Sequence, residues 1–183
     1  MQVQKKTGEI TQHVWRFDPN YSSIEFNVTK LFFFKVSGRF SKFSGAIVLD
    51  EEDLRRSSAV ATLKADSIES GISRRDAQLK TKGFLDVRKY PEIEFQSSQV
   101  AAGKDRDTFR VTGNLTINGR TKEITLEVNA IDRSRSPRGE EFVYYTASAE
   151  LDRFDFGVNY GPALIGRTLK VTINVQASRK IEN

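Results

Sequence analysis

The sequence predicts an all-β fold, an extended antiparallel barrel of about eight strands with one short α-helix between strands. The first observation behind this prediction is a hydrophobic period of two, which places one face of a strand in the core and the other in water. The second is the series of polar turns between the alternating segments, and the third is the scarcity of the helical period. Clean alternation in many segments is typical of antiparallel sheet.

Five segments alternate cleanly, and within each the apolar side chains share one face. These apolar sets are Ile24, Phe26 and Val28; Phe109, Val111, Leu115 and Ile117; Ile124, Leu126, Val128 and Ala130; Val143, Tyr145, Ala147, Ala149 and Leu151; and Leu169, Val171, Ile173, Val175 and Ala177. The Asn118-Gly119 pair between the second and third segments is a strong signal for a β-hairpin. Longer polar turns at 101–107 and 134–139 separate other segments.

A further apolar stretch changes the face on which its side chains lie. The apolar positions in 36–40 share one face of a strand, and those in 43–49 share the other. A β-bulge at Ser41 and Lys42 would return both sets to one side. We therefore expect one long strand with a bulge.

One segment, residues 73–82, carries a clear helical pattern. Ser73 is a candidate N-cap, and Asp76, three residues later, falls in the first turn as in a capping box. Leu79 supplies an inward contact, and Gly83 can end the helix.

The length of 183 residues is that of one domain. We expect an N-terminal tail at 1–12, a barrel domain at 13–178 and a C-terminal tail at 179–183. The longest bulky apolar run, 31–34, is far shorter than the ~20 residues of a membrane-spanning helix, so we expect no integral membrane segment. Residues 1–13 contain no apolar core of a signal peptide, which predicts a cytoplasmic protein, or a periplasmic one if the chain is a mature or engineered form.

The composition excludes several kinds of chemistry. Cysteine is absent, and His13 is the single histidine, so thiolate sites, disulfides and histidine metal clusters are ruled out. Asp152 and Asp155 could form a carboxylate pair for acid–base catalysis, but the sequence supplies neither a nucleophile nor a metal site beside them. We therefore expect no enzymatic activity, no metal and no cofactor.

The net charge of +5 is moderate, and acidic residues lie near most of the scattered basic groups. Proteins that bind nucleic acids usually concentrate basic residues in one stripe or tail. We therefore expect no nucleic-acid partner.

The predicted strands are long for their number. The segment from Phe109 to Ile117 has nine residues and would extend ~30 Å. A barrel of about eight strands is just wide enough for its own side chains or for one small ligand. The pattern leaves both alternatives open, a solid interior and a narrow apolar cavity that would suit a long apolar ligand.

Some aromatic and basic residues have two interpretations each. Phe32, Phe33 and Phe34 occupy both faces of a strand, so they form either a turn over a barrel end or an exposed lip at a cavity mouth that could touch a membrane. Trp15 is expected to plug one barrel end, and contact with a ligand from the barrel wall is the alternative. The basic pair at 74–75 is either a solvated helix start or a cationic site for a lipid head group.

Several ordered motifs resemble those of the YceI-like family, which is lipocalin-like and binds polyisoprenoids. The most specific is RRDAQLKTKGFLDVRKYPEIEF at 74–95, and the resemblance extends over about 14–178. The other motifs are WRFDP at 15–19, SSIEF at 22–26, VSGRF at 36–40, FSG at 43–45, GNLTINGRTKEI at 113–124 and DRFDFG at 152–157.

The resemblance implies an extended antiparallel lipocalin-like barrel that holds a long-chain isoprenoid without covalent chemistry. We therefore expect binding, transport or storage of a long-chain apolar lipid, and a homodimer is compatible with this role. The alternative is a stress-response or interaction module with a solid barrel and no ligand. The interior residues expected to contact the lipid are Ile24, Phe26, Val28, Phe40, Phe43, Ile47, Phe95, Val111, Leu115, Ile117, Leu126, Val128, Tyr145, Val171 and Ile173.

Overall fold

The structure is a computed structural model that describes residues 12–181. Its strands are β1 (Gln12–Phe17), β2 (Ser23–Lys30), β3 (Phe34–Phe40), β4 (Phe43–Asp50), β5 (Ser58–Lys64), β6 (Ile68–Glu69), β7 (Glu92–Ala102), β8 (Thr108–Ile117), β9 (Arg120–Arg135), β10 (Glu140–Asp152) and β11 (Ile165–Lys180). The helix α1 spans Ser73–Leu79, and the 3-10 helices are η1 (Leu54–Arg56), η2 (Ala65–Ser67) and η3 (Arg153–Phe156).

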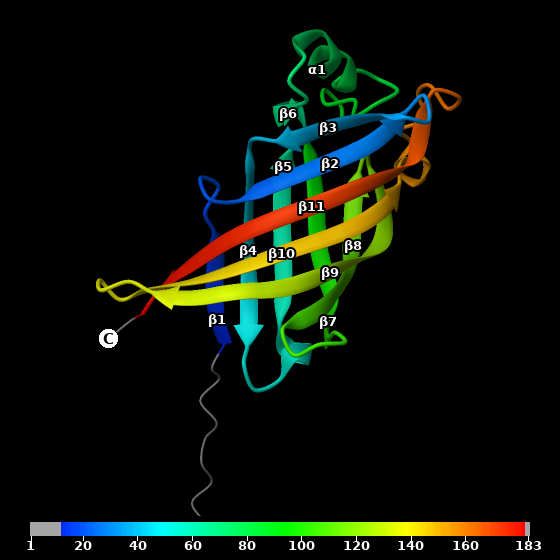
Figure 1. Cartoon of the computed structure of the whole chain (residues 1–183). Helices are drawn as coiled ribbons and strands as arrows, with labels where there is room; N and C mark the ends of the chain where they lie inside the picture. Colours follow the sequence, from blue (N-terminus) through cyan, green and yellow to red (C-terminus); the bar gives the residue numbers. More distant parts are fainter. Residues whose placement is uncertain (1–11, 182–183) are drawn as a thin grey trace, which may run out of the picture.

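Eight strands close into an antiparallel barrel, which confirms the predicted fold class (Figure 1). Their order is β1, β4, β5, β7, β8, β9, β10 and β11, and β11 returns to β1 through Arg16↔Ser178 and Phe17↔Ala177. The long β11 also pairs with β2, for example through Ile173↔Ile24. The β2–β3 hairpin therefore continues the wall beyond β1 toward the upper end in Figure 1.

The predicted bulge at Ser41 and Lys42 is wrong, because the chain there ends one strand and begins another. β3 pairs with β2 and β6, whereas β4 pairs with β1 and β5. The Ser41 N–H donates to the Ser67 carbonyl (3.1 Å), and the Lys64 N–H donates to the Lys42 carbonyl (2.9 Å). The apolar pattern changes face because the chain turns a corner and takes new neighbours.

The helix α1 is shorter than the predicted 73–82, and its start differs from a capping box. Ile72 occupies the N-cap position and makes no side-chain cap. Asp76 instead reaches back before the helix, where its Oδ1 accepts the Ser70 N–H (2.7 Å). The helix and the turns after it cover the upper end of the barrel in Figure 1.

The described chain begins in β1 and ends one residue after β11. Residues 1–11 of the predicted N-terminal tail lie outside the described residues, and Gln12 opens β1. The predicted C-terminal tail at 179–183 begins inside β11, where Arg179 is held by backbone pairing with Glu141 and by an Nε hydrogen bond to its carboxylate (2.7 Å); 182–183 are not described. No helix within residues 12–181 is long and apolar enough to cross a membrane.

A compact cluster at the lower end contains Trp15, Val143, Val175 and Ala177. Trp15 is fully buried, in keeping with its expected place at one barrel end. The guanidinium of Arg179 lies 4.8 Å from the centroid of the Trp15 ring. A larger cluster, which includes Leu63, Leu85, Leu115 and Phe156, packs around the upper part of the barrel.

Candidate functional site

An elongated apolar cavity of about 550 Å³ lies inside the barrel. Its walls are the inward faces of the strands, since the lining residues along β8, for example, are Phe109, Val111, Leu115 and Ile117. The eight residue steps from Phe109 to Ile117 correspond to ~27 Å at ~3.4 Å per residue. The volume falls within the usual range for sites that bind small molecules, roughly 300–1,000 Å³.

Fourteen of the fifteen residues predicted to contact a lipid line this cavity. They are Ile24, Phe26, Val28, Phe40, Ile47, Phe95, Val111, Leu115, Ile117, Leu126, Val128, Tyr145, Val171 and Ile173. Phe43, the first residue of β4, lies opposite Leu63 and packs against the buried upper cluster instead. For all of these residues, contact with a ligand stays a prediction.

Two glycines allow aromatic rings to lie close against the barrel wall. A Cβ on Gly38 would lie 2.5 Å from Cζ of Phe26, and one on Gly113 would lie 2.7 Å from Cζ of Phe95. Both phenylalanines line the cavity. The missing glycine side chains thus make room for these rings at the edge of the bore.

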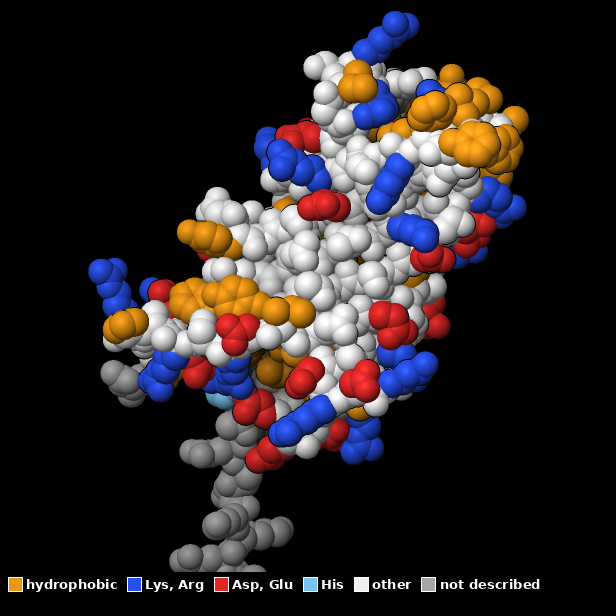
Figure 2. Space-filling model, in the orientation of Figure 1, with side chains coloured by type: hydrophobic (Ala, Val, Ile, Leu, Met, Phe, Trp, Pro, Cys, Tyr) orange, Lys and Arg blue, Asp and Glu red, His pale blue; other side chains and the backbone are white. Residues whose placement is uncertain are grey.

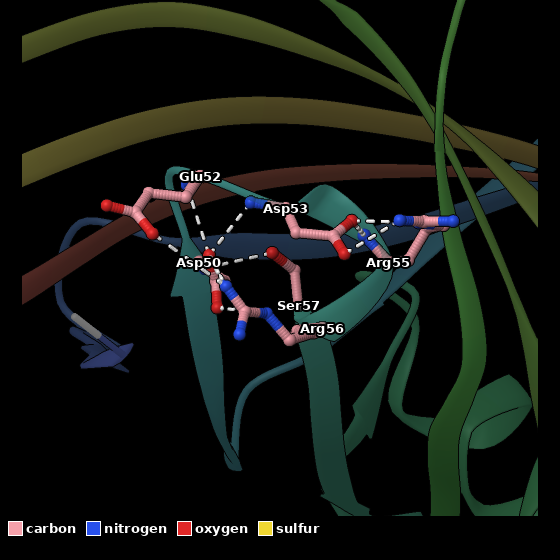
Figure 3. A network of polar contacts seen from close by, with 6 residues as sticks. All are labelled: Asp50, Glu52, Asp53, Arg55, Arg56 and Ser57. Carbon is pink, nitrogen blue, oxygen red and sulfur yellow. Dashed lines mark hydrogen bonds and ion pairs between the residues drawn. The ribbon is translucent and has the colours of Figure 1, made fainter. Parts of the chain in front are cut away.

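A polar network holds the β4–β5 connection at the lower end of the barrel (Figure 3). The carboxylate of Asp50 accepts the N–H groups of Glu52 (3.1 Å) and Asp53 (2.9 Å) and forms an ion pair with Arg56 (2.8 Å). The backbone N–H of Asp50 donates to Oγ of Ser57 (3.0 Å). Asp50 is 2% exposed, so its partners replace the water that it loses on folding.

The same network sets the charge of Asp50 and borders the lower part of the cavity. The N–H of Asp53 is the main cause that lowers the pKa of Asp50; burial opposes it, and the ion pair with Arg56 adds to it. Leu54 of η1 and the neighbouring Ser57 line the lower part of the cavity. A carboxylate that is ionised at neutral pH thus supports a segment that lines the lower part of the bore.

The upper end of the cavity is its mouth. Four of the lining side chains there, Lys30, Gln78, Tyr160 and Leu164, are exposed to solvent. The ring of Tyr160 lies 4.7 Å from that of Phe84, which also lines the cavity. Sequence reasoning missed these residues as site residues because most of them come from loops or turns without a repeating pattern.

Arg75 of α1 also lines the mouth. Its Nε donates to Oγ of Ser70 and its Nη2 to the Ser70 carbonyl, both over 2.7 Å. Arg74, by contrast, is exposed and is not among the lining residues. Of the two arginines at the helix start, Arg75 is therefore the one that lines the cavity.

Asp152, one of the two carboxylates considered for catalysis, has structural partners. Asp152 is paired with Arg167 and accepts the Phe154 N–H (2.9 Å) at the start of η3. The hydrogen bond from Arg167 is the main cause that lowers the pKa of Asp152, so this group is an ionised acceptor at neutral pH. Asp155 is exposed.

An antiparallel barrel around an apolar bore, with a mouth at one end, is the architecture of barrels that hold one small ligand. Residues 15–177 match the YceI-like domain, and the chain belongs to the YceI-like family. It is 31% identical over 162 residues to a UPF0312 protein of Pseudomonas aeruginosa, an alignment that covers 87% of this chain and 83% of that protein. A UPF0312 protein of Enterobacter sp. is 31% identical over 161 residues, covering 86% and 83%.

Solved structures share the fold. BcnA of Burkholderia cenocepacia superposes with a TM-score of 0.78 at 22% identity, covering 87% of this chain and 98% of BcnA. A polyisoprenoid binding domain from Saccharophagus degradans, implicated in plant cell wall breakdown, gives a TM-score of 0.67 at 17% identity, with coverage of 89% and 97%. At these identities the likeness shows a common fold.

Proposed function

We propose that this protein binds a long-chain apolar lipid of the polyisoprenoid type inside its barrel and carries or stores it without chemical change. The observation that carries the proposal is the elongated cavity and its apolar walls. A polyisoprenoid is a narrow hydrocarbon chain with methyl branches and no hydrogen-bonding groups along its length. Aliphatic and aromatic side chains on the inward faces of the strands suit such a chain.

The size of the cavity weighs against a solid, ligand-free barrel. Protein interiors are packed as densely as organic crystals, with few voids larger than a water molecule. An apolar bore of about 550 Å³ is far larger than such voids, and a bound lipid would bury its apolar walls away from water.

A solved structure of the same fold also supports the proposed binding of a lipid. One solved protein of the same fold is described as a polyisoprenoid binding domain. A binding function also agrees with the chemistry of Asp152. Its carboxylate forms an ion pair with Arg167, which is not the arrangement expected of a catalytic acid or base. The proposed role is therefore that of a binding protein rather than an enzyme.

The test is organic extraction of the purified protein followed by mass spectrometry. We expect about one long-chain apolar molecule per chain, and we expect an added long-chain polyprenol to raise the melting temperature of the delipidated protein. An extract without lipid, together with a melting temperature that polyprenol does not change, would support the ligand-free module instead.

A further inference from the structure

The hairpin between β2 and β3 carries consecutive apolar side chains into solvent. Leu31, Phe32, Phe33 and Phe34 are 41%, 84%, 87% and 64% exposed. Leu164 on the adjacent loop is 52% exposed, and its carbonyl accepts the Leu31 N–H over 2.8 Å. We call these five residues the apolar tip. Figure 2 shows hydrophobic side chains gathered at the upper corner where Figure 1 places this hairpin.

The backbone of the tip does not favour the residues it carries. Leu31 and Phe32 have φ angles of +50° and +66°, a region that large L-residues rarely adopt. The β8–β9 hairpin has nearly the same pair of φ angles, +53° at Asn118 and +66° at Gly119. Asn followed by Gly is the usual sequence for this type of turn. Local folding therefore does not account for Leu31 and Phe32, and unfavourable backbone geometry of this kind often accompanies function.

The apolar tip is continuous with the cavity. Leu164 belongs to the tip and also lines the mouth. Tyr160, 52% exposed, lines the mouth beside it, and Lys30 at the base of the hairpin does so as well. An apolar molecule could thus pass from the tip into the bore along a surface of apolar side chains.

Two lysines flank the hairpin. Lys30 and Lys35 are exposed, and neither makes an ion pair with any residue in the described range 12–181. Projecting apolar side chains beside lysines suit a bilayer with anionic head groups, since the side chains insert and the lysines meet the phosphates. A symmetric dimer through the tip would instead bring each lysine near its own copies and incur like-charge repulsion.

We propose that the apolar tip docks the protein on the surface of an anionic lipid bilayer, so that the cavity mouth faces the membrane that supplies or receives its lipid. This inference rests on the proposed function and names the source of the ligand. It assigns Leu31, Phe32 and Phe33 to membrane insertion and Lys30 and Lys35 to head-group contact.

The matched variant exchanges the turn for the residues that the other hairpin uses, Leu31→Asn with Phe32→Gly. It suits the backbone better than the natural pair, so the hairpin should fold while its insertion surface is lost. The measurement is flotation with vesicles of phosphatidylcholine, alone or mixed with phosphatidylglycerol. We expect the natural chain to float with the mixed vesicles and the variant to bind them more than about tenfold more weakly, because each inserted large apolar side chain changes partitioning by roughly tenfold or more.

Two control variants show which residues are responsible for vesicle binding. Ile131→Asn removes an apolar side chain that is 61% exposed but lies in β9, outside the tip and the mouth, and should leave vesicle binding unchanged. Lys30→Gln with Lys35→Gln should remove the preference for phosphatidylglycerol. The proposal would be overturned if the natural chain did not bind mixed vesicles, or if the turn variant bound them equally well. It would also be overturned if the tip held a dimer in solution that the turn variant dissociated.

Vesicle flotation is separable from ligand binding. The vesicles contain no polyisoprenoid, and polyprenol uptake can be measured in detergent without a bilayer. Tip-dependent flotation without lipid in the extract would support docking and contradict the proposed ligand. Polyprenol uptake without flotation would contradict docking and leave the proposed function intact.

Discussion

Beneath the cavity mouth, the buried guanidinium of Arg153 donates from Nη2 to the carbonyl oxygen of Ile165 over 2.8 Å. The same side chain donates to the carbonyls of Gly166 (2.8 Å) and Tyr160 (3.0 Å) and to that of Val158. One arginine thus fixes the segment between η3 and β11 through backbone acceptors. Since this segment carries Tyr160 and Leu164, Arg153 sets the shape of the mouth from below.

Replacing Arg153 with Met should loosen the mouth. The carbonyls of Val158, Tyr160 and Ile165 would lose their donor, which we expect to cost about 2–4 kcal/mol of the free energy of unfolding. Amide hydrogen exchange should rise most in residues 157–166, and bound lipid should be released faster. Lys170→Met is the control, because Lys170 makes only an exposed pair with Glu150 and should change stability by less than about 1 kcal/mol. Equal protection of residues 157–166 in both variants would argue against this role of Arg153.

Two glycine-to-alanine changes should have different consequences. A Cβ on Gly113 would lie 2.5 Å from the Gln96 carbonyl oxygen and 2.7 Å from the Ser97 Cα, and this backbone cannot easily move. We expect Gly113→Ala to lower stability by about 1–3 kcal/mol. On Gly38 the nearest atom, at 2.5 Å, is the far end of the Phe26 ring, which can swing into the cavity, and the nearest backbone atom, the Glu69 carbonyl oxygen, is farther away at 3.0 Å. Gly38→Ala should therefore lose less stability in chemical denaturation but take up less polyprenol.

The carboxylate of Asp50 predicts a dependence of stability on pH. Hydrogen bonds from the backbone, the Asp53 N–H above all, hold its pKa below the ordinary value of 3.8. Its contribution is therefore complete above that pH and is lost as the pH falls through the lower pKa of the folded state. Asp50→Asn should melt several degrees below the natural protein at pH 7, and the difference should shrink below about pH 4. A difference that stays constant down to pH 3 would show that ionisation of Asp50 is not the cause.

Much of the barrel wall could be predicted from sequence. In a strand with one face in solvent and the other in the interior, every second residue is apolar, and this alternation shows which side chains point inward. The inward sets of β8 to β11 follow directly from this period, and so does the Asn118-Gly119 hairpin. The corner at Ser41 and Lys42 could not be predicted, since it depends on which strands become neighbours. A change of face in the pattern is compatible with both a bulge and a corner.

The mouth of the cavity was the least predictable part. Tyr160, Leu164 and Phe84 reach it from segments without a regular period, and their positions depend on contacts such as those of Arg153. For the aromatic run at 32–34 the sequence left two interpretations open, and the high exposure of Phe32 and Phe33 favours the lip at the mouth. Cytoplasmic location and a homodimer stay predictions.

A substitution at Val111 best distinguishes a barrel with a hollow bore from a barrel with a solid core. Its side chain lines the cavity between Val100 and Leu126 on the neighbouring strands and belongs to neither buried cluster. In a solid core, Val111→Trp would overpack the interior and cost about 1–3 kcal/mol. In a bore, the indole can occupy the space meant for lipid, so we expect the delipidated variant to keep nearly all its stability in chemical denaturation.

The lipid recovered after extraction should then fall well below that of the natural protein, because one ring would block a bore that, in a barrel of eight strands, is just wide enough for one small ligand. Asn114→Trp is the matched control, since Asn114 lies on the exposed face of the same strand and should leave both stability and lipid content unchanged. A Val111→Trp variant that loses stability, with no lipid in either protein, would point to a collapsed interior. Stability kept while lipid is lost would show that the free volume beside Val111 is ligand space, because in a well-packed core the same ring could not be added without strain.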